Sequence, residues 1–231
     1  MAGLDDLRGF QKVMGLAKNH VVHPRPLNIH GKPPPPIRVP MNVFLSQPCL
    51  DQVSQQFPWL VPKPHPAPSH STLVVPRDVA SLKMNIIQHY VPFQAAGLDF
   101  IPLPVWHGDD LISLGFAFSV TSSANTGATT NVVYISDISK MIPETLEFIV
   151  TTLPPTDILI VDALLPEHPH SVHFNLKQAI SLAKQIKPKQ HTYLVGMSCD
   201  AFPPHDTMNA TLAKTKGCNI SFAHDGLVVE L

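Results

Sequence analysis

The amino-acid sequence predicts an α/β (α+β) fold in which mixed β-sheets are covered by outer helices. Short apolar runs separated by turn residues follow one another between positions 84 and 135, which is typical of a β-meander. Helical and strand-like patterns alternate after Asp137, which is typical of strands joined by helices. Of the 231 residues, 44% are hydrophobic and only 14% are charged, so the chain can bury a large core. We therefore expect a single domain over residues 1–231.

A short amphipathic helix is predicted at the start of the chain. Apolar residues recur there about every 3.6 positions, at Leu4, Leu7, Phe10, Val13 and Met14. Proline removes amide donors, so the proline-rich segment 21–40 is expected to be an extended surface loop. The elements predicted next are a strand at 41–46, a helix at 50–57 and a second Pro/His-rich loop at 61–70.

Strand patterns dominate the middle of the chain and then alternate with helices. Strand-like runs are predicted at 84–90, 98–105, 111–120 and 131–135, with turns at 96–97 and 122–127. The elements predicted after Asp137 are a helix at 143–151, a strand at 158–162, a helix at 175–186, a strand at 192–197, a helix at 205–214 and a closing hairpin at 224–226. This order predicts a mixed sheet with helices outside it.

The net charge and the cysteine content indicate which partners and which cellular environment to expect for this chain. The formal net charge is -1 and no basic patch is evident along the sequence, so nucleic acid is not an expected partner. The first thirty residues contain no uninterrupted apolar segment, so neither a signal peptide nor a membrane span is predicted. Cys49, Cys199 and Cys218 match no zinc-knuckle or disulfide spacing, and we expect reduced thiols in a cytoplasmic protein.

Polar side chains of the ligand type follow several apolar runs. His107, Asp137 and Cys199 each come at or just after the end of a predicted strand, and His173 precedes a predicted helix. His224 lies in the closing hairpin. Imidazoles, carboxylates and thiolates that separate strands bring to one edge of a sheet can bind a divalent metal. This pattern predicts a metal-dependent hydrolase.

Each of these residues also has a purely structural interpretation. His107 can cap a turn, and Asp137 can cap a helix. Cys199 can be a small buried hydrophobe, and His224 can pack or donate a hydrogen bond beneath the site. The nucleotide-binding motifs GxGxxG and Walker A and the GxSxG elbow do not occur, which disfavours nucleotide-cofactor chemistry and an α/β-hydrolase triad.

Six segments in order resemble the metallo-β-lactamase fold: GLDDLRGF, PLPVWHGDD, VVYISDIS, HFNLKQAISLAKQIKPK, YLVGMS and AHDGL. They are most similar to the branch that contains the cyclic-phosphate phosphodiesterases of phosphonate breakdown and their eukaryotic relatives. The resemblance implies an αββα sandwich with a dinuclear Zn²⁺ or Mn²⁺ site at the sheet edges. It also implies a small-molecule substrate with a phosphodiester or related ester bond.

The resemblance gives each candidate residue a role. It makes His107 a ligand of one metal and Asp137 a bridging, catalytic carboxylate. His173 resembles an accessory histidine that completes the metal site, and His224 resembles the histidine of the closing hairpin, where it would contact the leaving group or phosphate. Cys199 stands where the related motif GMSH or GMTH has histidine, and a thiolate there favours zinc over manganese.

The chain departs from the family pattern at its start. The HxHxDH motif, which normally precedes the GLDDLR helix, does not occur in this sequence. We therefore expect a metallo-β-lactamase-like domain without its N-terminal strands and first metal motif, which would hold at most one Zn²⁺ or Mn²⁺ well. The predicted function is a metal-dependent hydrolase of phosphodiester or related ester bonds. The alternative is a catalytically inactive scaffold or a truncated fragment, and a homodimer is left open as the assembly. A third interpretation, an RNA-processing nuclease of the same fold, is disfavoured because neither a basic arm nor a basic patch is evident in the sequence.

Overall fold

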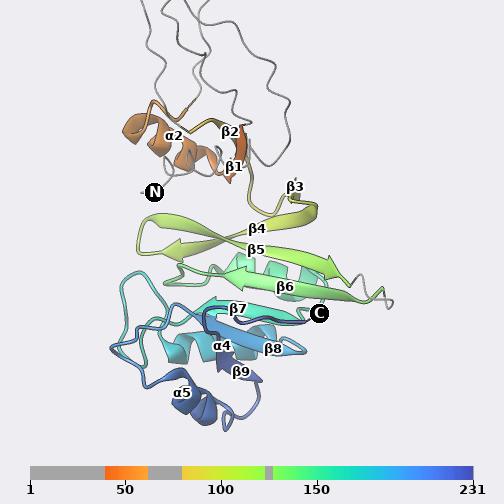
Figure 1. Cartoon of the computed structure of the whole chain (residues 1–231), viewed down its shortest axis with the longest axis vertical. Helices are drawn as coiled ribbons and strands as arrows, with labels where there is room; N and C mark the ends of the chain where they lie inside the picture. The colour runs from red at the N-terminus through yellow and green to blue at the C-terminus, as the bar shows by residue number, and fades with distance from the viewer. Residues whose placement is uncertain (1–39, 62–79, 123–126, 231) are drawn as a thin grey trace, which may run out of the picture. The chain divides into compact units, whose positions relative to one another are not determined.

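A computed structural model describes residues 40–61, 80–122 and 127–230 of the chain (Figure 1). The helix predicted at the start and most of the two proline-rich loops lie outside these residues, as does the centre of the turn predicted at 122–127. The chain divides into two compact units, Met1–Ile87 and Gln88–Leu231, and each is described by itself. The single domain over 1–231 stays a prediction.

The first unit contains a two-stranded sheet and one helix. Strand β1 (Met41–Leu45) pairs in parallel with β2 (Leu82–Ile86), and α2 (Gln47–Gln56) lies between them in the sequence. The strand predicted at 41–46 is confirmed. The helix begins earlier than predicted because Ser46 caps it, its Oγ accepting from the Cys49 amide at 3.4 Å. The run predicted at 84–90 is not part of the meander, because β2 pairs with β1 in a separate sheet of the described residues.

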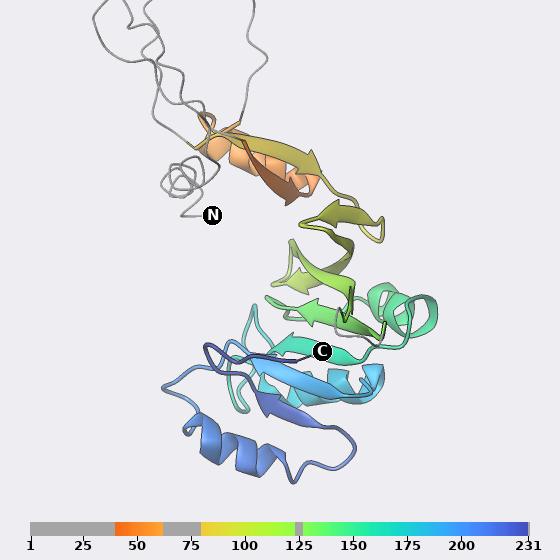
Figure 2. The same cartoon turned by 45° about the vertical axis from the view of Figure 1, so that its right-hand side comes forward.

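The second unit is built on a seven-stranded mixed sheet, in which the strands lie side by side in sequence order (Figure 2). The strands are β3 (Phe93–Ala95), β4 (Leu98–His107), β5 (Leu111–Thr121), β6 (Thr129–Ile135), β7 (Ile158–Asp162), β8 (His191–Val195) and β9 (Ile220–Phe222). Neighbours from β3 to β6 are antiparallel, and neighbours from β6 to β9 are parallel. The predicted α/β class with a mixed sheet is therefore confirmed. Strand β3 was not predicted.

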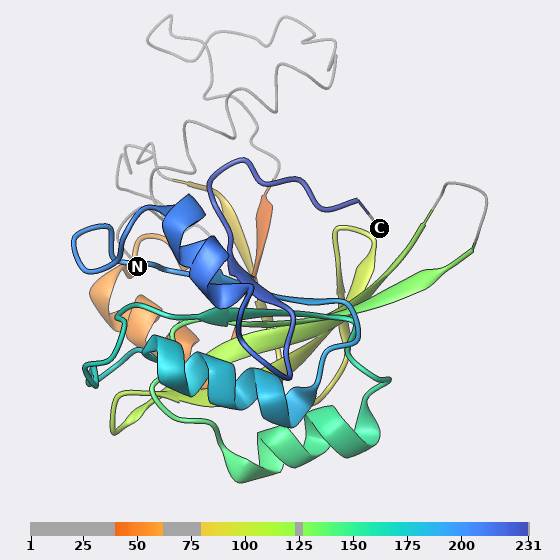
Figure 3. The ribbon, with the colours of Figure 1, turned by 90° about the horizontal axis from the view of Figure 1, so that it is seen from below.

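Helices follow the strands of the second unit close to their predicted positions (Figure 3). Helix α3 (Pro143–Glu147) continues as a π-helical turn (Phe148–Thr152), and α4 (Leu176–Ile186) and α5 (His205–Leu212) complete the set. Asn175 and Gln178 form a capping box at the start of α4, which fixes where the helix begins. No helix among the described residues is long and apolar enough to cross a membrane.

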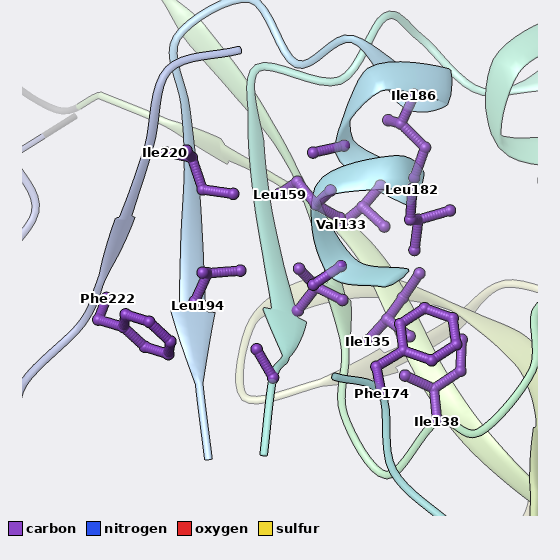
Figure 4. Packing of buried hydrophobic residues seen from close by; sticks show 14 of the residues in the cluster. Val133, Ile135, Ile138, Leu159, Phe174, Leu182, Ile186, Leu194, Ile220 and Phe222 are labelled. Atoms are coloured by element: carbon purple, nitrogen blue, oxygen red, sulfur yellow. The ribbon is translucent and has the colours of Figure 1, made fainter. Parts of the chain in front are cut away.

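One apolar core lies between α4 and the parallel strands. Leu182 and Ile186 of α4 face Val133, Leu159 and Leu194 of the sheet (Figure 4). Further members of the same cluster are Leu103, Val105, Ile135, Ile138, Ile149, Phe174, Met208, Leu212, Ile220 and Phe222. Because this core holds β4, β6, β7, β8 and β9 in one rigid sheet, it also fixes the positions of the strand ends.

The closing hairpin predicted at 224–226 is wrong. Asp225 and Gly226 do form a turn, with Gly226 at φ 80° and the Leu227 amide donating to the His224 carbonyl at 3.1 Å. However, β9 pairs in parallel with β8, and residues 227–230 form no strand. A turn dipeptide makes a hairpin only where both flanking segments find ladder partners. Here Val228 stays 80% exposed instead.

Replacing Thr192 by valine is expected to raise the free energy of unfolding by about 1 kcal/mol, because burying an unpaired hydroxyl is costly. Thr192 is fully buried, and its Oγ1 has no hydrogen-bond partner among the described residues. Thr145→Val is the matched control, because buried Thr145 donates to the Pro104 carbonyl at 2.7 Å and contacts the Tyr90 hydroxyl at 2.7 Å. Urea denaturation should show opposite signs for the two variants; equal destabilisation would contradict the prediction.

Candidate metal centre

The topology of the second unit brings several strand ends to one edge of its sheet. Strands β4 and β6 are both antiparallel to β5, so they run in the same direction, and β7, β8 and β9 are parallel to β6. The carboxyl ends of these five strands therefore lie at the same edge. In open α/β sheets this is the edge at which ligands usually bind.

Three of the predicted ligands meet at this edge. His107, Asp137 and His173 each offer one ligand atom, and these atoms all lie within 4.8 Å of one another. The rings of His107 and His173 have centroids 5.0 Å apart, and Nδ1 of His173 lies 3.8 Å from Oδ1 of Asp137. Two imidazoles and a carboxylate at this spacing are a donor set that suits a divalent cation.

His107 is held by the loop that follows β7. Its Nδ1 lies 2.8 Å from the carbonyl oxygen of Val172. Because a carbonyl only accepts, Nδ1 carries the proton, and the neutral ring then presents the lone pair of Nε2. Gly108 has φ 85°, and a Cβ there would lie 3.3 Å from a Val172 methyl group, so glycine allows this close approach.

Asp137 lies in a loop that is hydrogen bonded to the end of β4. The Ser139 amide donates to the Trp106 carbonyl at 2.7 Å, and the Gly108 amide donates to the Ser139 hydroxyl at 2.9 Å. Asp137 itself has φ 54°, a left-handed conformation that few residues other than glycine adopt. Its side chain is 61% exposed, so the carboxylate faces solvent beside the two histidines. Aspartate is one of the few residues with a Cβ that tolerate the left-handed conformation.

Asp162 holds the third member of the cluster. Its Oδ2 lies 2.6 Å from Nδ1 of His173, and the Ile138 amide also donates to this carboxylate. Burial raises the pKa of Asp162, and the charge of Asp137 raises it further, although the contact with His173 opposes both effects. An ionised Asp162 accepts the proton of His173 Nδ1 and leaves Nε2 free. A carboxylate behind the imidazole of a metal ligand is a common arrangement.

Asp162 has a role that the sequence pattern does not indicate. The pattern places it correctly at the end of a strand, but nothing in it distinguishes this aspartate from a helix cap. The sequence shows an aspartate at the end of an apolar run with a histidine eleven residues later. Only the structure shows that Asp162 is buried, with 3% of its surface exposed. A buried charge requires a partner, and His173 is that partner.

Gly196 makes room for the Asp162 carboxylate. It follows β8, has φ 75°, and a Cβ at this position would lie 2.7 Å from Oδ1 of Asp162. Real Cβ atoms essentially never approach an oxygen so closely. Glycine is therefore required here both by the backbone conformation and by the space next to Asp162.

Cys199 and His224 are not members of the three-residue cluster. Cys199 is exposed in the turn after β8, and all three cysteines of the chain are free thiols. His224 is exposed after β9, and its Nδ1 lies 3.0 Å from the Asp225 carbonyl. Both residues follow strands that end at the same edge as the cluster. Their roles as zinc ligand and substrate contact stay predictions.

Comparison with solved structures identifies the architecture as the metallo-β-lactamase fold. One similar structure is a diphosphatase from the PhnP family, with a TM-score of 0.63 and 24% identity over 99% of this chain. Another is the metallo-β-lactamase fold protein YhfI from Bacillus subtilis, with a TM-score of 0.57 and 14% identity over 98% of this chain. The chain spans 66% of the length of the diphosphatase and 72% of that of YhfI. No protein-family model and no curated protein sequence matches it.

Proposed function

We propose that the chain is a metal-dependent hydrolase of phosphodiester or related ester bonds in small molecules. The observation that carries this proposal is the cluster of His107, Asp137 and His173, whose ligand atoms lie within 4.8 Å of one another. The likeness to a structure described as a diphosphatase supports a phosphate-containing substrate. Sequence identities of 24% and 14% show a shared fold and do not show a shared substrate. The substrate class is therefore part of what we propose.

The donor set fits one divalent cation. Two neutral imidazoles and a carboxylate are the ligands of many catalytic zinc sites, in which a further position stays open for water or substrate. Manganese also accepts a carboxylate, but it favours oxygen donors more strongly than zinc does. We propose Zn²⁺ or Mn²⁺ at His107, Asp137 and His173, with Cys199 as a further donor. Three clustered donors support one ion, because a second one would need donors of its own.

A bound divalent cation would polarise a phosphoryl or carbonyl oxygen and make water more acidic. The residues around the proposed site would orient the ligands, accept a proton and contact the substrate. Hydrogen bonds from Nδ1 orient His107 and His173, which keeps their tautomers fixed. The exposed carboxylate of Asp137 can accept a proton from water next to the substrate. His224, exposed at the same edge of the sheet, is proposed to contact the phosphate or leaving group.

Removing the His107 imidazole is expected to abolish both metal binding and turnover. Purified chain would be dialysed against Zn²⁺ or Mn²⁺, analysed for bound metal, and assayed with a bis-aryl phosphodiester. His107→Ala should lose bound metal and hydrolysis, because it removes one of three donors. His168→Ala is the matched control, since His168 is exposed and outside the cluster. Metal and turnover that survive His107→Ala would overturn the proposal.

A non-catalytic scaffold is the second candidate. The observation that favours it is the small number of clustered donors, since neither Cys199 nor His224 joins the three-residue group. A scaffold would bind no stoichiometric metal and would turn over no ester, yet it would fold cooperatively. The metal analysis above separates the two candidates directly. A cytoplasmic location and a homodimer also stay predictions.

A further inference from the structure

A second polar surface lies at the opposite edge of the seven-stranded sheet. The loop between α4 and β8 carries Lys187 and Lys189, and the loop between α5 and β9 carries Lys214 and Lys216. Both loops lead into the amino ends of parallel strands (Figure 2), whereas the candidate metal centre lies at the carboxyl ends. Strands of five residues separate the two edges by about 16 Å.

Hydrogen bonds hold the two lysine loops together. The Asn219 side chain donates to the Gln190 carbonyl at 2.8 Å, and the Thr192 amide donates to the Asn219 carbonyl at 2.8 Å. The Lys189 amide in turn donates to the Thr156 carbonyl at 3.0 Å, which fixes the first loop to the segment before β7. The lysines therefore extend from a rigid base, although they come from segments that are distant in the sequence.

The lysines have no carboxylate beside them in the sequence and form no ion pair with a described residue. Lys184 in the last turn of α4 adds to the four loop lysines, and all five side chains are exposed. None of the five forms an ion pair with a described residue, and residues 184–193 and 211–221 contain no carboxylate. The nearby carboxylate of Asp157 is buried, and its Oδ2 accepts from the Asn131 amide at 2.8 Å. The result is a local positive field on a chain of net charge -1.

Two partly exposed rings follow Lys189 in β8 and lie on the face of the sheet opposite α4, because the alternate residues Thr192 and Leu194 are buried. His191 and Tyr193 of β8 pack with ring centroids 4.4 Å apart, and Nε2 of His191 lies 2.7 Å from the Ser221 hydroxyl. Burial lowers the pKa of His191, so its ring is uncharged near neutral pH. Lysines beside partly exposed rings are the combination with which proteins bind single strands, since phosphates pair with the cations and bases stack on the rings.

We propose that the surface formed by the loop lysines Lys187, Lys189, Lys214 and Lys216, together with His191 and Tyr193, binds single-stranded nucleic acid. The ligand chemistry is a phosphodiester backbone with unpaired bases. The sequence alone predicts no such partner, because the lysines are divided between two segments and only the fold joins them. The proposal does not depend on the hydrolase function.

Fluorescence anisotropy of a labelled 12-nucleotide oligouridine with the full chain tests the proposal. EDTA would be present, so that the candidate metal centre takes no part. With about four phosphates neutralised, affinity should fall roughly 50-fold between 50 and 200 mM salt. The double variant Lys189→Glu/Lys216→Glu should lose at least about tenfold in affinity and show a shallower salt dependence. Tyr193→Leu should weaken binding of the oligouridine but not of an abasic strand of equal length.

Lys140→Glu/Lys177→Glu is the matched control, because it changes the net charge equally with two exposed lysines that lie at the carboxyl edge of the same sheet. This control should keep at least about half of the affinity at 150 mM salt, a concentration at which exposed charges more than about 8 Å away are screened. No binding at 50 mM salt would overturn the proposal, as would equal losses in both double variants. Binding to anionic lipid vesicles without binding to the oligonucleotide would overturn it as well.

Discussion

Replacing Asp162 by asparagine is expected to lower the affinity for Zn²⁺ by roughly 10- to 100-fold, the usual effect of removing a carboxylate behind a metal-binding imidazole. In its ionised form the Asp162 carboxylate accepts the Nδ1 proton of His173, 2.6 Å away, and this keeps Nε2 available to a cation. An asparagine keeps the size of the side chain but removes the charge, so its amide oxygen holds the Nδ1 proton of His173 less strongly than a carboxylate does. Competition with a chromophoric chelator would measure the affinity.

Asp157→Asn is the matched control, because Asp157 is a buried carboxylate immediately before the same strand and accepts from the Asn131 amide. Both variants should lose about 1–2 kcal/mol of unfolding free energy, since each disturbs a buried hydrogen bond to a charged group. Only Asp162→Asn should change the metal affinity. Equal affinities for the two variants would show that Asp162 has a structural role alone.

Gly196→Ala is expected to destabilise the protein by about 2–3 kcal/mol and to lower the metal affinity at least about tenfold. Two costs combine. An alanine at φ 75° adopts a left-handed conformation at a cost of about 1 kcal/mol or more, and its Cβ would also lie 2.7 Å from Oδ1 of Asp162. Because a real contact of that length is not tolerated, Asp162 must move and the contact with His173 must lengthen.

Gly217→Ala separates the two costs. Gly217 has φ 85°, but apart from its two chain neighbours no described residue has a heavy atom within 4 Å of the position that a Cβ would take. This variant should show the backbone cost alone, about 1 kcal/mol, with unchanged metal affinity. Thermal unfolding and chelator competition on both variants give the comparison. The explanation through Asp162 fails if Gly196→Ala binds zinc as tightly as the unaltered protein does.

Much of the second unit is predictable because its local signals agree with its tertiary structure. The run 158–162 is apolar and bounded by turn residues, and it forms β7 over the predicted residues. Asn175 and Gln178 mark the start of α4 three residues apart, and both hydrogen bonds of the capping box form. In these segments propensity, capping and burial all favour the same element.

Where local patterns are ambiguous, the prediction fails. Strand β3 has only three residues, too few for a period to be visible, and it exists because Ala96 and Gly97 form a tight turn with positive φ onto β4. Asp225 and Gly226 carry an equally good turn signal, but the segment after them pairs with no strand in the part of the chain that the structure describes. Turn chemistry determines where the chain reverses, whereas partners distant in the sequence determine whether a strand follows.

In the candidate site, too, some features follow from local sequence patterns and others depend on residues that are distant in the sequence. Strand-end positions predict that His107, Asp137 and His173 approach one another, and they do so within 4.8 Å. The supporting residues are less visible from the sequence, because the role of Asp162 depends on burial and that of Gly196 on a close approach. A residue type shows whether a side chain can bind a metal. Whether another residue holds that side chain in place depends on packing, which the sequence does not show.

The hydrogen bonds between the loop at 136–140 and the end of β4 have a thermodynamic consequence. Trp106, Ser139 and Lys140 connect the segment that carries Asp137 to the one that carries His107. Fraying of this junction would therefore separate two ligands at once, so the open form would have little affinity for a cation. An ion that binds only the closed form stabilises that form by mass action. Metal occupancy and protection of this junction from local unfolding should therefore rise together as the metal concentration increases.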